Sequence, residues 1–220
     1  MSSEELNTTS TINFILEGGL KLRCISSTIA KAMLFAHQFI RCADKVSYDP
    51  AMLAAAALSL SSRSFDETLN ETEVVLTFYH MVKGEYLMDL YSETKIDLEK
   101  SLKITELFLF RMLEGLTSHN IAHEYVAFYS RNLLPLSKIV LVWESYMECV
   151  WKIISDFYTS KKCLDYQASH IAIAAIQAAL TNIDVQPTIS DEWHKLFCPD
   201  LTAKMKDQIV EDILEICNLA

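Results

Sequence analysis

The stretch from Tyr48 to Glu67 constrains the fold more than any other part of the sequence. It reads YDPAMLAAAALSLSSRSFDE and places four consecutive alanines between leucines. Asp49 can cap a helix with its carboxylate, and Pro50 suits the first helical position, where a backbone N–H has no partner within the helix. Alanine has the highest helix propensity, and its small side chain lets other helices approach closely. The stretch therefore predicts a helix that other helices surround.

The far end of this predicted helix is polar. It contains Ser61, Ser62, Arg63, Asp66 and Glu67. Because charged side chains are rarely buried without a partner, we expect this end to leave the packed interior and to face water or another molecule.

A second alanine-rich stretch repeats the first. Shifting the chain so that Leu53 falls on Ile171 also places Tyr48 on Tyr166 and aligns the two alanine runs, and the preceding helices match in character. Such a repeat predicts two copies of a bundle of about five helices, each built around an alanine-rich helix. Only the first copy ends in a charged cluster, because the second ends in TNID (residues 181–184).

Apolar residues at helical spacing predict the other helices. Their expected ranges are 12–19, 26–43, 71–82, 96–116, 123–133, 137–158, 166–180 and 203–219. The range 71–82 contains β-branched valines and could instead form a strand, because short apolar runs are ambiguous. Residues 83–94 lack a clear period and predict a loop, and residues 1–10 are polar and predict a mobile tail.

Composition argues against several classes of function. With 19 Lys and Arg against 29 Asp and Glu, the net charge is −10, which disfavours direct contact with nucleic acid. No apolar run approaches the roughly 18 residues that span a bilayer, so we expect no membrane partner. The six cysteines form no C-x-x-C pair, and because the start MSSEELNTTS is polar and acidic we expect no signal peptide before them. They predict buried thiols in a reducing, intracellular compartment.

The sequence shows no catalytic or metal-binding motif. His119 and His123 are four residues apart and could meet on a helix, but no third histidine or cysteine stands at a suitable spacing nearby, so we expect no metal site. The other histidines are isolated, and we expect them to be packed or solvated: His37, His80, His170 and His194. Phosphate-binding loops and nucleophile elbows are absent, so we expect neither catalytic residues nor a cofactor.

Taken together, these features resemble a cyclin. The resemblance lies in FILEGGLKL (14–22), YDPAMLAAAALSL (48–60), YQASHIAIAAIQAAL (166–180) and WHKLFCPDLTAKMKDQIVEDILEI (193–216), and it covers nearly the whole chain. Among cyclins, the sequence most resembles the cyclin Q subfamily of the transcription-associated group. The resemblance implies an all-α fold of two tandem five-helix cyclin boxes, at residues 11–118 and 119–220, with an extra N-terminal helix.

The resemblance also implies a function. Cyclins are regulatory subunits, not enzymes, and form heterodimers with cyclin-dependent kinases. A lysine that ends the third helix and a glutamate in the fifth grip the kinase near its C-helix. Arg63 and Glu106 stand at these positions, and Phe65, Phe110 and Leu113 are the implied neighbouring contacts. The cyclin Q likeness implies a partner like cyclin-dependent kinase ten, in the nucleus, the cytoplasm or both.

Three departures from the family pattern mark a divergent member. Arg63 replaces the lysine, so a planar fork of donors replaces a point charge. Phe65 and Asp66 stand where the family has an acidic pair, and Ile121 and Ala122 stand where a His-Pro is usual before the second box. These changes bear on the identity of the kinase more than on the fold.

Other functions stay open at this point. A transcription-factor-IIB-like adaptor would share the fold, but such factors are basic where this chain is acidic, which argues against direct DNA contact. A non-kinase helical scaffold, or a helical enzyme with a buried pocket, is also compatible with the pattern. An associated kinase activity would separate these alternatives from the cyclin interpretation.

Overall fold

The computed structural model describes residues 3–43, 47–84, 92–115, 120–133, 143–183 and 192–217. Every regular element within these ranges is a helix, and they contain no strand. The predicted all-helical fold class is therefore confirmed, and the strand alternative for residues 71–82 is wrong. The contacts between Cα atoms divide the chain into two compact units, residues 1–119 and 120–220.

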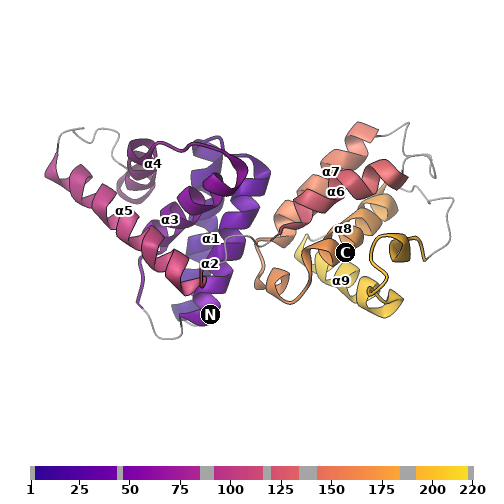
Figure 1. Ribbon diagram of the computed structural model, residues 1–220. Helices are drawn as coiled ribbons and strands as arrows, with labels where there is room; N and C mark the ends of the chain where they lie inside the picture. Colours follow the sequence, from indigo (N-terminus) through magenta and orange to yellow (C-terminus); the bar gives the residue numbers. More distant parts are fainter. Residues whose placement is uncertain are drawn as a thin grey trace. The chain divides into compact units, whose positions relative to one another are not determined.

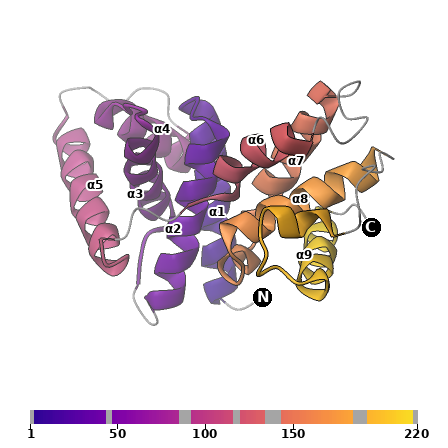
Figure 2. The same ribbon diagram turned by 45° about the vertical axis from the view of Figure 1, so that its right-hand side comes forward.

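The first unit is a bundle around one central helix. It contains α1 (Ser3–Lys21), α2 (Ser26–Cys42), α3 (Pro50–Ser62), the short 3-10 helix η1 (Arg63–Phe65), α4 (Glu71–Lys83) and α5 (Glu93–Met112). Helix α3 packs against α1, α2, α4 and α5, and Figures 1 and 2 show it among the other four. The four alanines of residues 54–57 each expose 3% or less. The prediction of a surrounded helix is confirmed.

Capping residues set the ends of the helices as the sequence indicates. The Asp49 carboxylate accepts a hydrogen bond of 2.8 Å from the backbone N–H three residues on, and Pro50 follows at the first helical position. Asn70 caps α4 in the same manner, and Gly84 ends it with a φ of +70°, which favours glycine. The Ser92 hydroxyl caps α5, which therefore begins slightly before the expected residue 96.

The serines at the end of α3 are buried, so the expectation of an exposed polar end is wrong for them. Ser61 exposes none of its surface, and its hydroxyl donates to the Thr28 carbonyl (3.0 Å). The Ser62 hydroxyl donates to the Ser59 carbonyl (2.9 Å). A small hydroxyl can be buried once a backbone carbonyl accepts its proton, whereas the exposed Arg63 that follows retains a full charge.

Helix α1 begins at Ser3, so the segment expected as a tail, residues 1–10, is helical from residue 3 onward. That segment contains no glycine or proline, and its polar composition does not prevent a helix. The next turns bury Ile12 and Ile15 in the bundle, and a helix that is fixed there extends toward the N-terminus one hydrogen bond at a time. The N-terminal helix therefore packs within the first unit.

Two glycines let α1 approach its neighbours closely. A Cβ atom on Gly18 would lie 2.5 Å from Cζ of Phe78, and one on Gly19 would lie 2.6 Å from Cγ1 of Ile29. Neither glycine ends the helix, although glycine lowers helix propensity by about 1 kcal/mol relative to alanine. Close packing offsets that cost.

The second unit has a similar central helix. It contains α6 (Ala122–Leu133), α7 (Trp143–Phe157), the 3-10 helix η4 (Lys161–Leu164), α8 (Ala168–Asn182), the 3-10 helix η5 (Trp193–Leu196) and α9 (Ala203–Ile216). Helix α8 packs against α6, α7 and α9 (Figure 2), and all of its residues from 170 to 180 are buried except Gln177. Each alanine-rich helix is thus central to its own unit.

Some sequence-based expectations concern residues outside the described ranges. These are His119, residue 116 at the expected end of a helix, residues 137–142 and 218–219 of two further helices, and residues 85–91 of the predicted loop.

All six cysteines are free thiols. Cys163 and Cys198 are buried, but Cys42 is exposed, so the prediction of buried thiols is wrong for Cys42. Among the described residues, no helix combines the length and the apolar character that a membrane crossing needs.

His123 is a buried aromatic residue of the second unit. Its ring lies 4.8 Å from the Trp151 ring and 5.9 Å from the Tyr158 ring, measured between centroids. Burial lowers the pKa of His123 to about 4, so the imidazole is neutral near pH 7.

Replacing Gly18 with alanine should destabilise the first unit. The new methyl group would meet the buried Phe78 ring, and overpacking of this kind costs about 1–3 kcal/mol, which exceeds the gain of about 1 kcal/mol in helix propensity. Asn13→Ala on the exposed side of α1 is the matched control, and it should stabilise slightly. Urea denaturation measures both, and a Gly18→Ala variant as stable as Asn13→Ala would contradict the close packing.

The stability of the second unit should fall in mild acid because of His123. The unfolded imidazole takes up a proton near pH 6.5, whereas the folded one does so only near pH 4. The stability that the neutral ring supports is therefore fully present above pH 6.5 and is lost as the pH falls. Between pH 7 and pH 5 we expect a loss of about 2 kcal/mol in the free energy of unfolding. His123→Phe should lack this part of the pH dependence, and an unchanged dependence would refute it.

Candidate functional site

An ion pair joins the end of α3 to the middle of α5. Nη2 of Arg63 lies 2.5 Å from Oε2 of Glu106. The Arg63 side chain is 59% exposed, whereas that of Glu106 is only 9% exposed. The structure thus brings together the two positions singled out from the sequence, with a surface guanidinium beside a buried carboxylate.

Glu106 is buried because of its place on α5. It shares the buried face of that helix with Leu102 and Leu109, at the spacing of four and three residues that one face requires. This helix packs against α3. An ionised carboxylate in such a row is costly unless a cation or hydrogen bonds compensate for its lost hydration, and Arg63 supplies both.

The second carboxylate oxygen of Glu106 is a buried acceptor. Within the part of the chain that the structure describes, Oε1 accepts no hydrogen bond. A buried acceptor without a donor costs about 1–3 kcal/mol. A donor from a partner molecule that reached this oxygen would therefore gain more than an ordinary surface hydrogen bond.

The turn that follows Arg63 is fixed to the start of α2. The Glu67 carboxylate accepts hydrogen bonds from the backbone N–H of Ile25 (3.1 Å) and from the hydroxyl of Thr28 (2.5 Å). Asp66 has a φ of +55°, which reverses the chain between Arg63 and Glu67. Glu67 was expected only at an exposed end of the helix, but its side chain caps the start of α2.

Phe65 lies half-buried beside Arg63. Nζ of the buried Lys31, on α2, is 5.1 Å from the centroid of the Phe65 ring. This distance is within the range of a cation–π interaction, which contributes about 0.5–2 kcal/mol. The ring therefore has a defined position next to the ion pair.

Phe110 and Leu113 differ in exposure. Phe110 is 41% exposed, but Leu113 is only 6% exposed and ends α5 inside the unit. The helix ends in a Schellman motif, in which the N–H of Gly115 donates to the carbonyl of Phe110 (2.9 Å). Phe110 can touch a partner, whereas Leu113 supports the helix from beneath.

Helix α5 exposes more apolar surface than the sequence analysis recognised. Ile104, Leu107 and Phe108 are each between 42% and 67% exposed. Together with Phe110 they form what we call the α5 apolar strip. The run LFLF at residues 107–110 was a signal, because four successive residues point in four directions around a helix and cannot all face the core. Such exposed apolar groups mark interaction surfaces.

No protein-family model matches the chain. Among curated proteins, Cyclin-T1-2 of Arabidopsis thaliana is 24% identical over 207 residues, which are 90% of this chain and 42% of that protein. Cyclin-L1-1 of the same plant is 19% identical over 86% of this chain and 45% of its own length. Cyclin-T1-3 of Oryza sativa subsp. japonica is 20% identical over 92% of this chain and 41% of its own length. The chain thus spans less than half the length of these relatives.

Two solved structures contain chains with the same fold. One is the crystal structure of the yeast RNA Pol II CTD kinase CTDK-1 complex, in which the matching chain has a TM-score of 0.76 at 15% identity, with 98% of this chain and 67% of that chain covered. The other is the CAK complex from Chaetomium thermophilum bound to ATP-gamma-S, with a TM-score of 0.68 at 14% identity and coverages of 98% and 62%. The chain is similar to cyclins in sequence and shares its fold with chains of kinase complexes.

Removing the guanidinium should destabilise the first unit through Glu106. Arg63→Ala leaves a buried carboxylate without its cation, and we expect a loss of about 1–2 kcal/mol, at the low end for such pairs because Arg63 is largely exposed. In a Glu106→Gln background the same change should cost less than about 0.5 kcal/mol. A double-mutant cycle by urea denaturation measures the difference, and equal costs in both backgrounds would show that the pair is energetically silent.

Proposed function

We propose that this chain is the regulatory subunit of a cyclin-dependent kinase. It binds the kinase through the end of α3, the adjoining Phe65, and the α5 apolar strip. The observation that carries the proposal is the Arg63–Glu106 pair, which joins a mostly exposed guanidinium to a buried carboxylate whose Oε1 accepts no hydrogen bond from the described residues. The similarity to cyclins supports the same interpretation.

The three parts of this surface have complementary tasks. The α5 apolar strip packs against the hydrophobic face of an amphipathic helix of the kinase. It can do so because Ile104, Leu107 and Phe108 lie exposed along one side of α5. Arg63 offers its exposed N–H groups to backbone carbonyls at the end of such a helix, whereas the buried Oε1 of Glu106 can accept a hydrogen bond from the partner only if its side chain shifts toward the surface. Apolar contact then gives affinity, and the polar pair fixes the register.

Activation follows from which kinase conformation fits this surface. A protein kinase is active when its C-helix is turned inward, so that the glutamate of that helix pairs with the lysine of strand β3. A rigid partner that contacts only the inward position shifts the population toward the active state, by an amount limited by its preference for that state. The chain itself performs no chemical step.

Arginine at position 63 changes the geometry of the contact. Its planar fork already uses Nη2 on Glu106, and its remaining N–H groups can bind a second acceptor in the same plane. A lysine would offer a single ammonium group there. We infer that Arg63 holds Glu106 and a kinase carbonyl at the same time, and that it selects kinases in which the carbonyl lies in that plane.

We further propose the finer assignments that the resemblance implies. Residues 11–118 and 119–220 act as two cyclin boxes, the chain belongs with the cyclin Q subfamily, and its partner is like cyclin-dependent kinase ten. The complex works in the nucleus, as the transcription-associated cyclins to which the chain is similar suggest. An adaptor of the transcription-factor-IIB type is the second candidate, although the net charge of −10 does not favour DNA.

The decisive experiment measures binding and phosphorylation together. The purified chain is mixed with each of a panel of purified cyclin-dependent kinases, including cyclin-dependent kinase ten, and both the affinity and the kinase rate are measured. We expect one or a few kinases to bind and to be activated. Arg63→Glu and Leu107→Glu should each weaken binding by about 2–4 kcal/mol, since both place a buried charge against the partner.

Arg131→Glu is the matched control, because it reverses an exposed arginine on α6 of the second unit. It should leave binding unchanged, and circular dichroism should show all three variants folded. The proposal is wrong if no kinase is stimulated, and the interface is wrong if a kinase is activated equally by all variants.

A further inference from the structure

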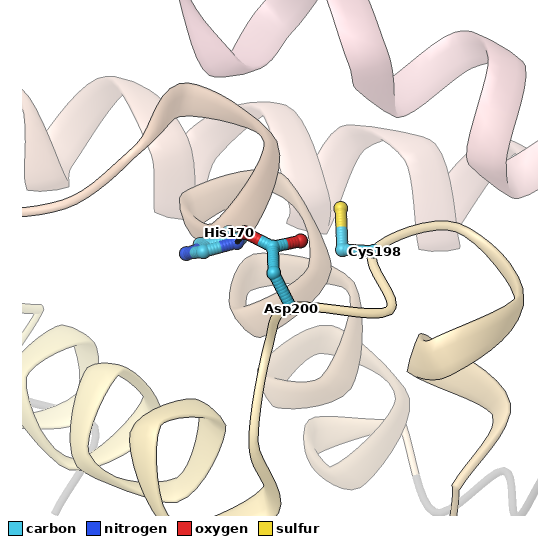
Figure 3. A group of neighbouring side chains, drawn as sticks. All are labelled: His170, Cys198 and Asp200. Atoms are coloured by element: carbon cyan, nitrogen blue, oxygen red, sulfur yellow. Dashed lines mark hydrogen bonds and ion pairs between the residues drawn. The ribbon is translucent and has the colours of Figure 1, made fainter.

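Three potential metal ligands meet in the second unit. They are His170, Cys198 and Asp200, and their ligand atoms all lie within 4.8 Å of one another. Figure 3 shows the three side chains gathered between α8 and the loop that leads to α9. The imidazole Nε2 is 3.1 Å from Oδ2 of Asp200. His170 looks isolated in the sequence, because its neighbours in space lie about thirty residues further along the chain.

The cluster is built on fixed backbone. His170 is the third residue of α8, and it is 2% exposed. The loop that carries the other two ligands is held at Cys198, whose N–H donates to the His194 carbonyl (2.9 Å) and whose carbonyl accepts from the N–H of Leu201 (3.1 Å). Leu201 is fully buried. Ligands on such anchored segments need little reorganisation to bind an ion.

The distances are close to those of a metal centre. Zinc binds a histidine nitrogen at about 2.0–2.1 Å, a cysteine sulfur at about 2.3 Å and a carboxylate oxygen at about 2.0–2.2 Å, so tetrahedral ligand atoms lie roughly 3.3–3.8 Å apart. The His170–Asp200 separation is already near that range. The Asp200 side chain is 61% exposed and can rotate toward an ion held between His170 and Cys198, whose ligand atoms lie within 4.8 Å of each other.

The ligand types select the metal. A thiolate, an imidazole and one carboxylate suit Zn²⁺, whereas Mg²⁺ and Ca²⁺ require oxygen ligands in greater number. The Tyr129 hydroxyl lies 3.6 Å from the Cys198 sulfur, where it can donate a hydrogen bond to a thiolate. Outer donors of this kind orient the ligands of a metal and tune its affinity. The exposure of Asp200 leaves a fourth position open to water.

We propose that His170, Cys198 and Asp200 form a zinc site in the second unit, with water as the fourth ligand. When zinc binds, the thiol of Cys198 loses its proton to solvent, and the resulting thiolate coordinates the ion. The site ties the start of α8 to the segment before α9. It is independent of the proposed kinase-binding surface, which lies in the first unit.

The test uses the purified full chain freed of metal by a chelator. Zn²⁺ should bind with a stoichiometry of one in isothermal titration calorimetry and should raise the melting temperature. Co²⁺, used as a visible substitute, should give the ligand-to-metal charge-transfer absorption of a cobalt–thiolate bond. Asp200→Asn should weaken Zn²⁺ binding at least tenfold, and Cys198→Ser should abolish the charge-transfer absorption.

Asp207→Asn and Cys163→Ser are the matched controls, because they change an exposed acid of α9 and a buried thiol of the same unit. Both should bind the two metals as the unaltered chain does. Asp200 is exposed, so its replacement by asparagine tests the site without disturbing the core. The proposal is overturned if the unaltered chain shows neither binding nor the absorption, or if Asp200→Asn and Cys198→Ser bind as the controls do.

Discussion

The close approach of four helices to α3 is the constraint on which the first unit depends. Alanine side chains occupy so little space that α1, α2, α4 and α5 can all pack against the same helix. Gly18 and Gly19 have the same effect on α1, because neither has a side chain that would hold its neighbours away. Because α3 and α5 are in direct contact, the end of one lies beside the middle of the other, and Arg63 can reach Glu106. The pair that we propose to bind the kinase is thus a product of core packing.

The second unit uses a central alanine-rich helix differently. Helix α8 is as deeply buried as α3, but the last residues that the structure describes at its end, Thr181, Asn182 and Ile183, carry no charge. Its chemistry-bearing group lies instead near its start, where His170 meets the loop before α9. A buried alanine-rich helix therefore carries a polar site at its C-terminal end in the first unit and near its N-terminal end in the second. This division agrees with a protein in which the first unit carries the partner contact and the second has another task.

Local signals in the sequence were enough for much of the fold. Asp49 and Pro50 marked the start of α3, the alanines marked its burial, and the repeat identified α8. Arg63 stood out as part of the charged end of the alanine-rich stretch, but Glu106 and its pairing with Arg63 came from the resemblance alone, since no local pattern reveals that a glutamate is buried. The burial of Ser61 depends on a carbonyl of α2, and the His170 cluster depends on the loop after η5, so both needed tertiary structure. Of the α5 apolar strip, only Phe110 was expected to meet a partner; the run LFLF signals the rest, but its exposed side chains were not recognised from the sequence.

The anchoring of Glu67 has a consequence for the timing of recognition. Its two hydrogen bonds hold the turn after Arg63 against α2 before any partner arrives. A surface that is already ordered loses little conformational entropy on association, so nearly all of its contact energy is retained in the complex. Among related partners, such energy is expressed mainly in how slowly the complex dissociates. In the proposed kinase complex, the anchoring of Glu67 therefore lengthens the lifetime of the bound state.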